Sequence, residues 1–280
     1  MAMATIASLL TRSITKSTNY SNGMTAKIKF TCAQLNSIVQ VTDGISDKLY
    51  VIYTPSKDIT FISLNNVVLS RASMRTNGTD NSTSIGTVDG VLFKHKVASI
   101  PPSCKNVTLT ILPSAIRVEY TVKHCTGSFE VGFYQCVVPA ESDYNYEFKA
   151  PIPKYTVQWL EALHTICNKQ DCFVKLYLMS DEWRIEADTN KLHEQPRRDY
   201  SFKQTYKLWK RISTKHIHDN RGICLQVSKS LLLSALQHIP GKCYLQSEEH
   251  GPCSISSNYK GIEYEILIRP LCLQTDIRKP

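Results

Sequence analysis

The sequence lacks the elements that would place it in a membrane or mark it as a common type of enzyme. Its longest apolar runs, such as residues 231–233, are a few residues long, far short of the ~20 residues that cross a bilayer. The patterns GxxxxGK[ST], GxGxxG, HExxH and GxSxG are all absent. We therefore expect no integral membrane protein, no enzyme, no catalytic residue and no cofactor.

The chain also lacks the cysteine spacing of a zinc site. It has ten cysteines but no CxxC, and Cys167 and Cys172 are the closest pair. Structural zinc sites use tight pairs together with a second pair or histidines. The spacing favours buried, reduced thiols in an intracellular protein, and no metal site.

Acidic residues are missing from the first 42 positions, since the first acid is Asp43. Residues 1–23 are rich in Ser and Thr, and they are predicted to be a flexible leader; a mitochondrial transit peptide is the alternative. The whole chain has 280 residues, 42% hydrophobic and 20% charged, which is typical of a globular protein of about two domains. Its 33 basic and 24 acidic residues give a net charge of +9, which favours a polyanionic partner.

The chain repeats an order of helix, strands, helix and strands. Residues 35–64 read as a helix and two strands, and residues 155–187 have the same pattern, including a second Lys-Leu-Tyr. Helices at 91–99 and 230–238 both run into Ile-Pro, with a cysteine three residues after the proline. Proline ends a helix, and the alternating segments that follow predict antiparallel strands.

Two such units predict an α+β fold with helices on one face of antiparallel sheets. We expect domain 1 over 24–140, a connecting loop over 141–153, domain 2 over 154–272 and a short tail over 273–280. The loop assignment rests on three prolines and on the absence of periodicity between residues 137 and 153.

Several stretches resemble the PCNA-like sliding-clamp family, and most closely the Rad-nine subunit of the nine-one-one checkpoint clamp. No single motif is specific; the order and spacing of the matches carry the resemblance over about residues 25–270. The matching segments are Ser46–Tyr50, Asp58–Phe61, Asn65–Ser73, Cys104–Leu112, His124–Gly127, Lys149–Pro151 and Arg221–Ile268.

The resemblance implies two tandem PCNA-like domains in one subunit of a heterotrimeric ring around double-stranded DNA. The implied partners are Rad-one-like and Hus-one-like subunits, a clamp loader, and repair or checkpoint client proteins, all in the nucleus. A Rad-one-like, Hus-one-like or homotrimeric clamp subunit is the first alternative. A mitochondrial or viral β-rich binding protein without a ring is another, and a metal-dependent nuclease is a third.

A clamp needs a positive inner wall that neutralises phosphates without reading bases. The DNA-facing candidates on or near the predicted helices are Lys94, Lys96, Lys154, Lys169 and Lys229. Otherwise the helix faces are expected to be neutral, with Gln34, Ser37 and Gln40 on the first helix. The densest basic stretch, residues 191–221, has nine basic and three acidic residues, and its candidates are Arg197, Arg198, Lys203, Lys207, Lys210 and Arg211. Interleaved aromatics there suit either base stacking or the buried face of a strand pair.

Three further groups of residues have functional interpretations. Asp181, Glu182, Glu186 and Asp188 form an acid cluster of the kind that binds metal in nucleases; a solvent-facing strand edge is favoured. His216 and His218 share one face of a strand but lack an evident third ligand. Tyr144, Tyr146 and Phe148 alternate through the connecting loop and offer apolar anchors for client peptides, or simply pin the loop to the sheet.

Overall fold

The structure is a computed structural model. It describes residues 26–54, 58–76, 84–134, 144, 146, 148–166, 173–178, 182–188, 201–207, 221–247, 251–270 and 272–278. The chain divides into two compact units, one of residues 1–142 and 258–265 and the other of residues 143–257 and 266–280. The domain limits expected from the sequence repeat remain a prediction.

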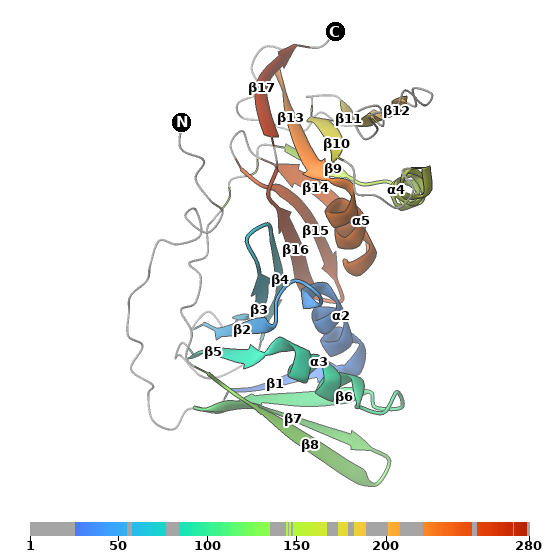
Figure 1. Ribbon diagram of the computed structural model, residues 1–280. Helices are drawn as coiled ribbons and strands as arrows, with labels where there is room; N and C mark the ends of the chain where they lie inside the picture. The colour runs from blue at the N-terminus through green and yellow to red at the C-terminus, as the bar shows by residue number, and fades with distance from the viewer. Residues whose placement is uncertain are drawn as a thin grey trace. The chain divides into compact units, whose positions relative to one another are not determined.

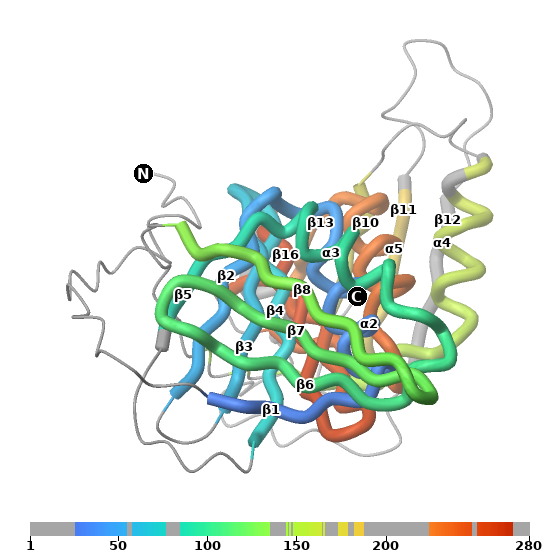
Figure 2. The backbone as a smooth tube through the Cα atoms, turned by 90° about the horizontal axis from the view of Figure 1, so that it is seen from below, coloured from blue at the N-terminus to red at the C-terminus, as the bar shows by residue number. Residues whose placement is uncertain are grey.

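A four-stranded antiparallel sheet forms one layer of the first unit (Figures 1 and 2). Its order is β1-β6-β7-β8, with bounds β1 (Ala26–Thr31), β6 (Asn106–Ile111), β7 (Ala115–Val122) and β8 (Cys125–Gly132). In β1, alternate residues are buried while Lys27 and Lys29 are exposed, because successive side chains of a strand point to opposite faces. The sheet therefore has one core face and one polar face.

The second layer of the first unit is built from hydrophobic strands. Its order is β5-β2-β3-β4, followed by β16, and the bounds are β2 (Lys48–Tyr53), β3 (Asp58–Leu64), β4 (Val68–Arg75), β5 (Ser84–Asp89) and β16 (Ile262–Ile268). Five consecutive residues of β2 and of β3 are buried, as expected of strands covered on both faces. Phe61 of β3 meets Phe30 of β1 edge to face, with ring centroids 6.3 Å apart.

Two helices of the first unit begin at capping residues that the local sequence supplies. Thr31 and Gln34 form a reciprocal capping box at the start of α2 (Cys32–Thr42). Asp89 accepts a hydrogen bond from the Leu92 amide at the start of α3 (Gly90–Ala98). α2 packs between the two layers, since it contacts β1 and β6 as well as β3 and β4.

The second unit repeats this plan. A five-stranded sheet has the order β12-β11-β10-β13-β17, and β9, β14, β15 and β16 lie side by side in another sheet. The bounds are β9 (Phe148–Pro151), β10 (Phe173–Leu178), β11 (Glu182–Asp188), β12 (Ser201–Lys207), β13 (Arg221–Ser228), β14 (Tyr244–Ser247), β15 (Cys253–Tyr259) and β17 (Cys272–Arg278). Helices α4 (Tyr155–Ile166) and α5 (Lys229–His238) pack against each other.

The tip of the β15–β16 hairpin is fixed to α2 and β4 of the first unit by polar contacts. Glu265 forms an ion pair with Arg71 at 2.5 Å, and the hydroxyl groups of Tyr264 and Ser37 are 2.5 Å apart. The Gln34 side chain donates to the Lys260 carbonyl at 2.8 Å. Because these contacts join residues more than 190 positions apart in the chain, no local sequence pattern predicts them.

Phe133 and Tyr134, the two residues that follow β8, contact β5 of the same unit. The amide of Tyr134 donates to the Thr87 carbonyl of β5 at 2.9 Å, and the ring of Phe133 lies over Gly86. A Cβ at Gly86 would be 2.2 Å from that ring, so glycine is required here for close approach.

The α+β prediction with helices packed on antiparallel sheets is confirmed, whereas two local assignments are wrong. Residues 273–278, expected to be a tail, belong to β17, which pairs with β13. Residues 148–151, expected to be part of a loop, form β9, which pairs with β14. Both strands pair with segments 46 or more residues away, so tertiary pairing decides them. Among the described residues, no helix is long and apolar enough to span a bilayer.

Candidate DNA-facing and partner-binding surfaces

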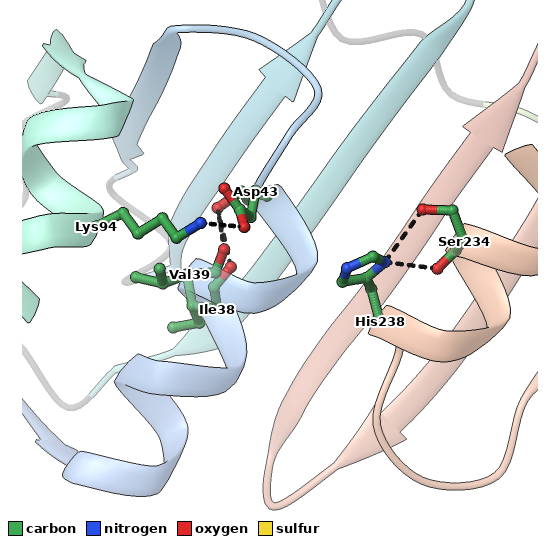
Figure 3. A network of polar contacts seen from close by, with 7 residues as sticks. Ile38, Val39, Asp43, Lys94, Ser234 and His238 are labelled. Atoms are coloured by element: carbon green, nitrogen blue, oxygen red, sulfur yellow. Dashed lines mark hydrogen bonds and ion pairs between the residues drawn. The ribbon is translucent and has the colours of Figure 1, made fainter. Parts of the chain in front are cut away.

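Lys94 and Lys96, two of the predicted DNA-facing residues, lie on α3 in different surroundings. The Lys94 ammonium group bonds to the carboxylate of Asp43, which follows α2 (Figure 3). Lys96 is exposed, and no described acid forms an ion pair with it. A phosphate can therefore reach the Lys96 charge directly, whereas it must compete with Asp43 for Lys94.

Lys154 and Lys229 lie at the starts of the two helices of the second unit. Lys154, just before α4, is exposed. Lys229, the first residue of α5, is 0% exposed. A buried ammonium group does not reach a phosphate, so the prediction that Lys229 faces DNA is wrong. Lys169 lies outside the described residues.

The exposed residues of α2 are neutral, as the sequence predicts, but one residue of the predicted set is not on the surface. Gln40 is exposed and Gln34 is half-buried, whereas Ser37 is buried and bonds to Tyr264. On α5, His238 Nδ1 contacts the Ser234 carbonyl at 2.6 Å and the Ser234 hydroxyl at 3.2 Å (Figure 3). Hydroxyl and amide groups carry no net charge that would attract phosphates strongly.

The basic segment is described only in part. Lys203 and Lys207 lie in β12, where the strand register sets them opposite Glu186 and Glu182 of β11. The other candidates lie outside the described residues; they are Arg197, Arg198, Lys210 and Arg211. The pairing partner of β12 is β11, which precedes the basic segment, so base stacking and a buried strand face both stay predictions for the aromatic residues of that segment.

Glu186, one member of the acid cluster of β11, forms an ion pair within its own strand. Glu186 Oε1 lies 3.0 Å from Arg184 Nε, and the guanidinium group of Arg184 stacks on the Tyr177 ring at 4.5 Å. Burial and the neighbouring Cys224 raise the pKa of Tyr177 to about 12. Within the described part of the chain, no group of three potential ligands is arranged for a metal ion. Asp181, His216 and His218 lie outside it.

The three aromatic residues of the connecting segment have separate roles. The rings of Tyr144 and Tyr146 stack with centroids 6.0 Å apart and an interplanar angle of 25°, and both are half-buried. Phe148 is 0% exposed in β9, so it packs in the core and is unavailable to a peptide. Only the tyrosine pair remains as an anchor for a partner.

Sequence analysis missed a pocket of the first unit beside the end of α2. It has a volume of about 190 Å³ and is lined by the loop after α2 and the first turn of α3, including Val39, Ile45, Leu49, Val91 and Phe93. Val91 and Leu92 are 48% and 43% exposed, an uncommon exposure for adjacent aliphatic residues at a helix start. Two exposed apolar residues beside a pocket are suited to receive an apolar side chain of a partner.

A wider groove of about 760 Å³ lies over β6, β7 and β8. Its lining is polar, with Lys105, Lys123 and Glu119 among hydroxyl-bearing side chains. The ring of Tyr120 covers Gly127 there; a Cβ at Gly127 would be 2.4 Å from it. This glycine is the last residue of the His124–Gly127 segment noted in the sequence.

Comparisons with known proteins identify the fold. No family model and no curated protein matches the sequence. The fold is that of PCNA: one similar solved structure is A. fulgidus PCNA bound to the C-terminal region of FEN-1, with a TM-score of 0.65 and 12% identity over 88% of this chain and 98% of that one. Another is PCNA from Entamoeba histolytica, with a TM-score of 0.64 and 10% identity over 88% and 99%. At this identity the likeness establishes the fold, and the function has to be argued from the surfaces.

Proposed function

We propose that this chain is one subunit of a ring-shaped DNA clamp, of the Rad-nine type, that acts in the DNA damage checkpoint and in DNA repair. The observation that carries the proposal is the PCNA-like fold over 88% of the chain, in both of its units. In this role the chain catalyses no reaction. It encircles duplex DNA in the nucleus, where a loader places it, and recruits client proteins. The segments that resemble Rad-nine subunits support that choice among clamp subunits.

Open strand edges support assembly into a ring. β8 is the last strand of its sheet, and β12 is the last strand of another. Among the described strands, neither has a neighbour on its outer side, and unpaired edges are templates for pairing with another chain. β8 contains one acid and no base, whereas β12 contains two lysines and no acid. Two different open edges suit head-to-tail contacts, which close into rings.

The DNA-contacting residues of this proposal are exposed lysines on or beside the helices. Lys96 and Lys154 are accessible, and Lys94 becomes so when it leaves Asp43. The few charges on a neutral surface suit a protein that slides on the phosphate backbone and reads no bases. The basic residues of the 197–211 segment are proposed as additional, sequence-independent contacts.

The first experiment is affinity purification of the tagged full-length chain from its own cells, followed by mass spectrometry and measurement of the mass of the complex. Recovery of one Rad-one-like and one Hus-one-like subunit in a complex with one copy of each is expected. A complex of about three copies of this 31.7-kDa chain would favour the homotrimeric alternative. A monomer without clamp-like partners would contradict the ring.

The tyrosine pair of the connecting segment provides a test of client binding. We expect Tyr146→Ala to weaken the affinity of client peptides by about tenfold, because it removes a stacked aromatic anchor from a half-buried position. The measurement is fluorescence anisotropy with peptides from clients recovered in the purification. Tyr155→Ala, at a 49% exposed tyrosine of α4, is the matched control. Equal affinities for wild type and Tyr146→Ala would show that the pair only fixes the segment to the sheet.

A further inference from the structure

A basic cluster on the second unit consists of Lys149, Lys154, Lys242 and Tyr244, and Lys154 is also one of the DNA-contacting lysines proposed above. Lys149 lies on β9, Lys154 precedes α4, and Lys242 and Tyr244 lie where α5 leads into β14. Strand pairing sets Tyr244 opposite Pro151. The Ile152 amide donates to the Cys243 carbonyl at 2.9 Å, so the two loops that carry the lysines are joined by a backbone hydrogen bond.

The Tyr244 ring holds two of the cations close together. The Lys149 ammonium nitrogen lies 5.2 Å from the centroid of the ring, and the Lys242 ammonium nitrogen lies 5.5 Å from it. The two charges are therefore within about 11 Å of each other. Cation–π contacts of this length fix flexible lysine side chains without neutralising them.

The cluster keeps its full charge. Lys149, Lys154 and Lys242 are exposed, and none of them forms an ion pair with a described acid. The Lys149 and Lys242 ammonium groups, held at one ring, therefore present two unneutralised positive charges close together. The N-terminus of α4, one residue after Lys154, adds a partial positive charge on the same side of the chain.

We infer that this cluster binds the phosphate backbone of duplex DNA, and that Lys149, Lys242 and Tyr244 thereby add to the contact proposed for Lys154. The inference rests on the proposed function and adds a surface to it. Lysine acts as a point charge that suits phosphates, whereas carboxylate recognition favours the arginine fork, and the cluster has no arginine. Consecutive phosphates of one strand rise by 3.4 Å, so two cations up to about 11 Å apart can contact phosphates up to about three nucleotides apart on that strand.

The Tyr244 ring positions the lysines and does not stack on a base. Both ammonium groups lie near it, and the residue is only partly exposed. Binding is therefore expected to be independent of base sequence and strongly dependent on salt. Replacing Tyr244 by Phe keeps the ring, whereas replacing it by Leu frees the two side chains.

The test is the salt dependence of duplex binding by the purified full-length chain, followed by fluorescence anisotropy of a labelled 30-base-pair DNA. The Lys149→Ala/Lys154→Ala/Lys242→Ala variant is expected to lose affinity by about tenfold or more at low salt. The slope of the logarithm of the association constant against the logarithm of the salt concentration is negative. Its magnitude should decrease by about 3 in this variant, because each phosphate contact contributes close to one unit. Tyr244→Leu should weaken binding about threefold, and Tyr244→Phe should restore it.

Matched controls separate this inference from the clamp itself. Lys27→Ala/Lys29→Ala, at exposed positions of β1, removes charge from the polar sheet face and should change the slope little. If Lys96→Ala reduces the salt dependence of duplex binding and the triple variant does not, the inference about the cluster is wrong, whereas the proposed clamp function is still supported. If the triple variant loses binding to a polyglutamate peptide while its DNA binding is unchanged, the cluster binds an acidic protein partner and the inference about DNA is wrong. Absence of DNA binding by the wild-type chain at low salt would also overturn it.

Discussion

Raising the pH from 9 to 11 is expected to lower the free energy of unfolding by about 2 kcal/mol through Cys253 alone. Burial raises the pKa of this thiol from its ordinary value of 9.0 to about 12, and its side chain is 0% exposed. Above pH 9 the unfolded chain releases the proton while the folded chain retains it. Each pH unit therefore costs about 1.4 kcal/mol. This contribution is complete below pH 9 and is lost as the pH rises to about 12.

Two other groups act in the same direction. Burial raises the pKa of Cys243 to about 11, and burial together with Cys224 raises that of Tyr177 to about 12. Both remain protonated in the folded state at pH values where the unfolded chain ionises. We therefore expect the free energy of unfolding to fall more steeply with rising pH than Cys253 alone would cause.

Urea denaturation at pH 8, 9, 10 and 11, with a reducing agent present, measures the effect. Cys253→Ala is expected to start from lower stability but to lose about 1.4 kcal/mol less per pH unit above pH 9. Cys125→Ala, at an exposed cysteine of β8, is the control and should follow the wild-type pH dependence. Parallel curves for wild type and Cys253→Ala would contradict the assignment to Cys253.

The second large effect is expected from Arg71→Met, which should lower the free energy of unfolding by about 3 kcal/mol. Glu265 is 7% exposed, and its carboxylate lies 2.5 Å from the Arg71 guanidinium group. Removing one partner of a buried ion pair leaves an uncompensated charge, which costs about 3–5 kcal/mol. The low end applies because the Arg71 side chain is 33% exposed.

The matched control is Arg117→Met, because Arg117 and Glu130 form an ion pair of the same length at an exposed position. Their side chains are 44% and 47% exposed, so the expected loss is below about 1 kcal/mol. The double variant Arg71→Met/Glu265→Leu should recover much of the stability, because it leaves no buried charge. Equal losses in the Arg71 and Arg117 variants would show that Glu265 is solvated when Arg71 is absent.

The elements with strong local signals were predictable from the sequence. The helices at 90–98 and 229–238 follow from apolar spacing and from the Ile-Pro that ends each pattern. The strands of 48–64 and 106–122 follow from alternation and turn residues. Strands β9 and β17 have no comparable signal and exist because β14 and β13 pair with them.

The candidate surfaces were less predictable, because exposure is a property of the folded chain. Lys96 and Lys229 are both lysines in amphipathic helices, yet one is exposed and the other is fully buried. Tyr146 and Phe148 are two residues apart in one aromatic series, and only Phe148 enters the core. The spacing of residues alone does not tell which of them is buried, because segments far away in the sequence pack over one side of the helix or strand and leave the other exposed.

The sequence by itself determined the α+β class, the repeated order of elements and the resemblance to clamps, because helix caps, prolines and alternating strands act over a few residues. Only the tertiary structure decided which charges are available. It buried Lys229, paired Arg71 with Glu265 across 194 positions and placed Lys149 and Lys242 on one Tyr244 ring. Interactions between residues so far apart depend on the fold, because the chain has to fold before they meet.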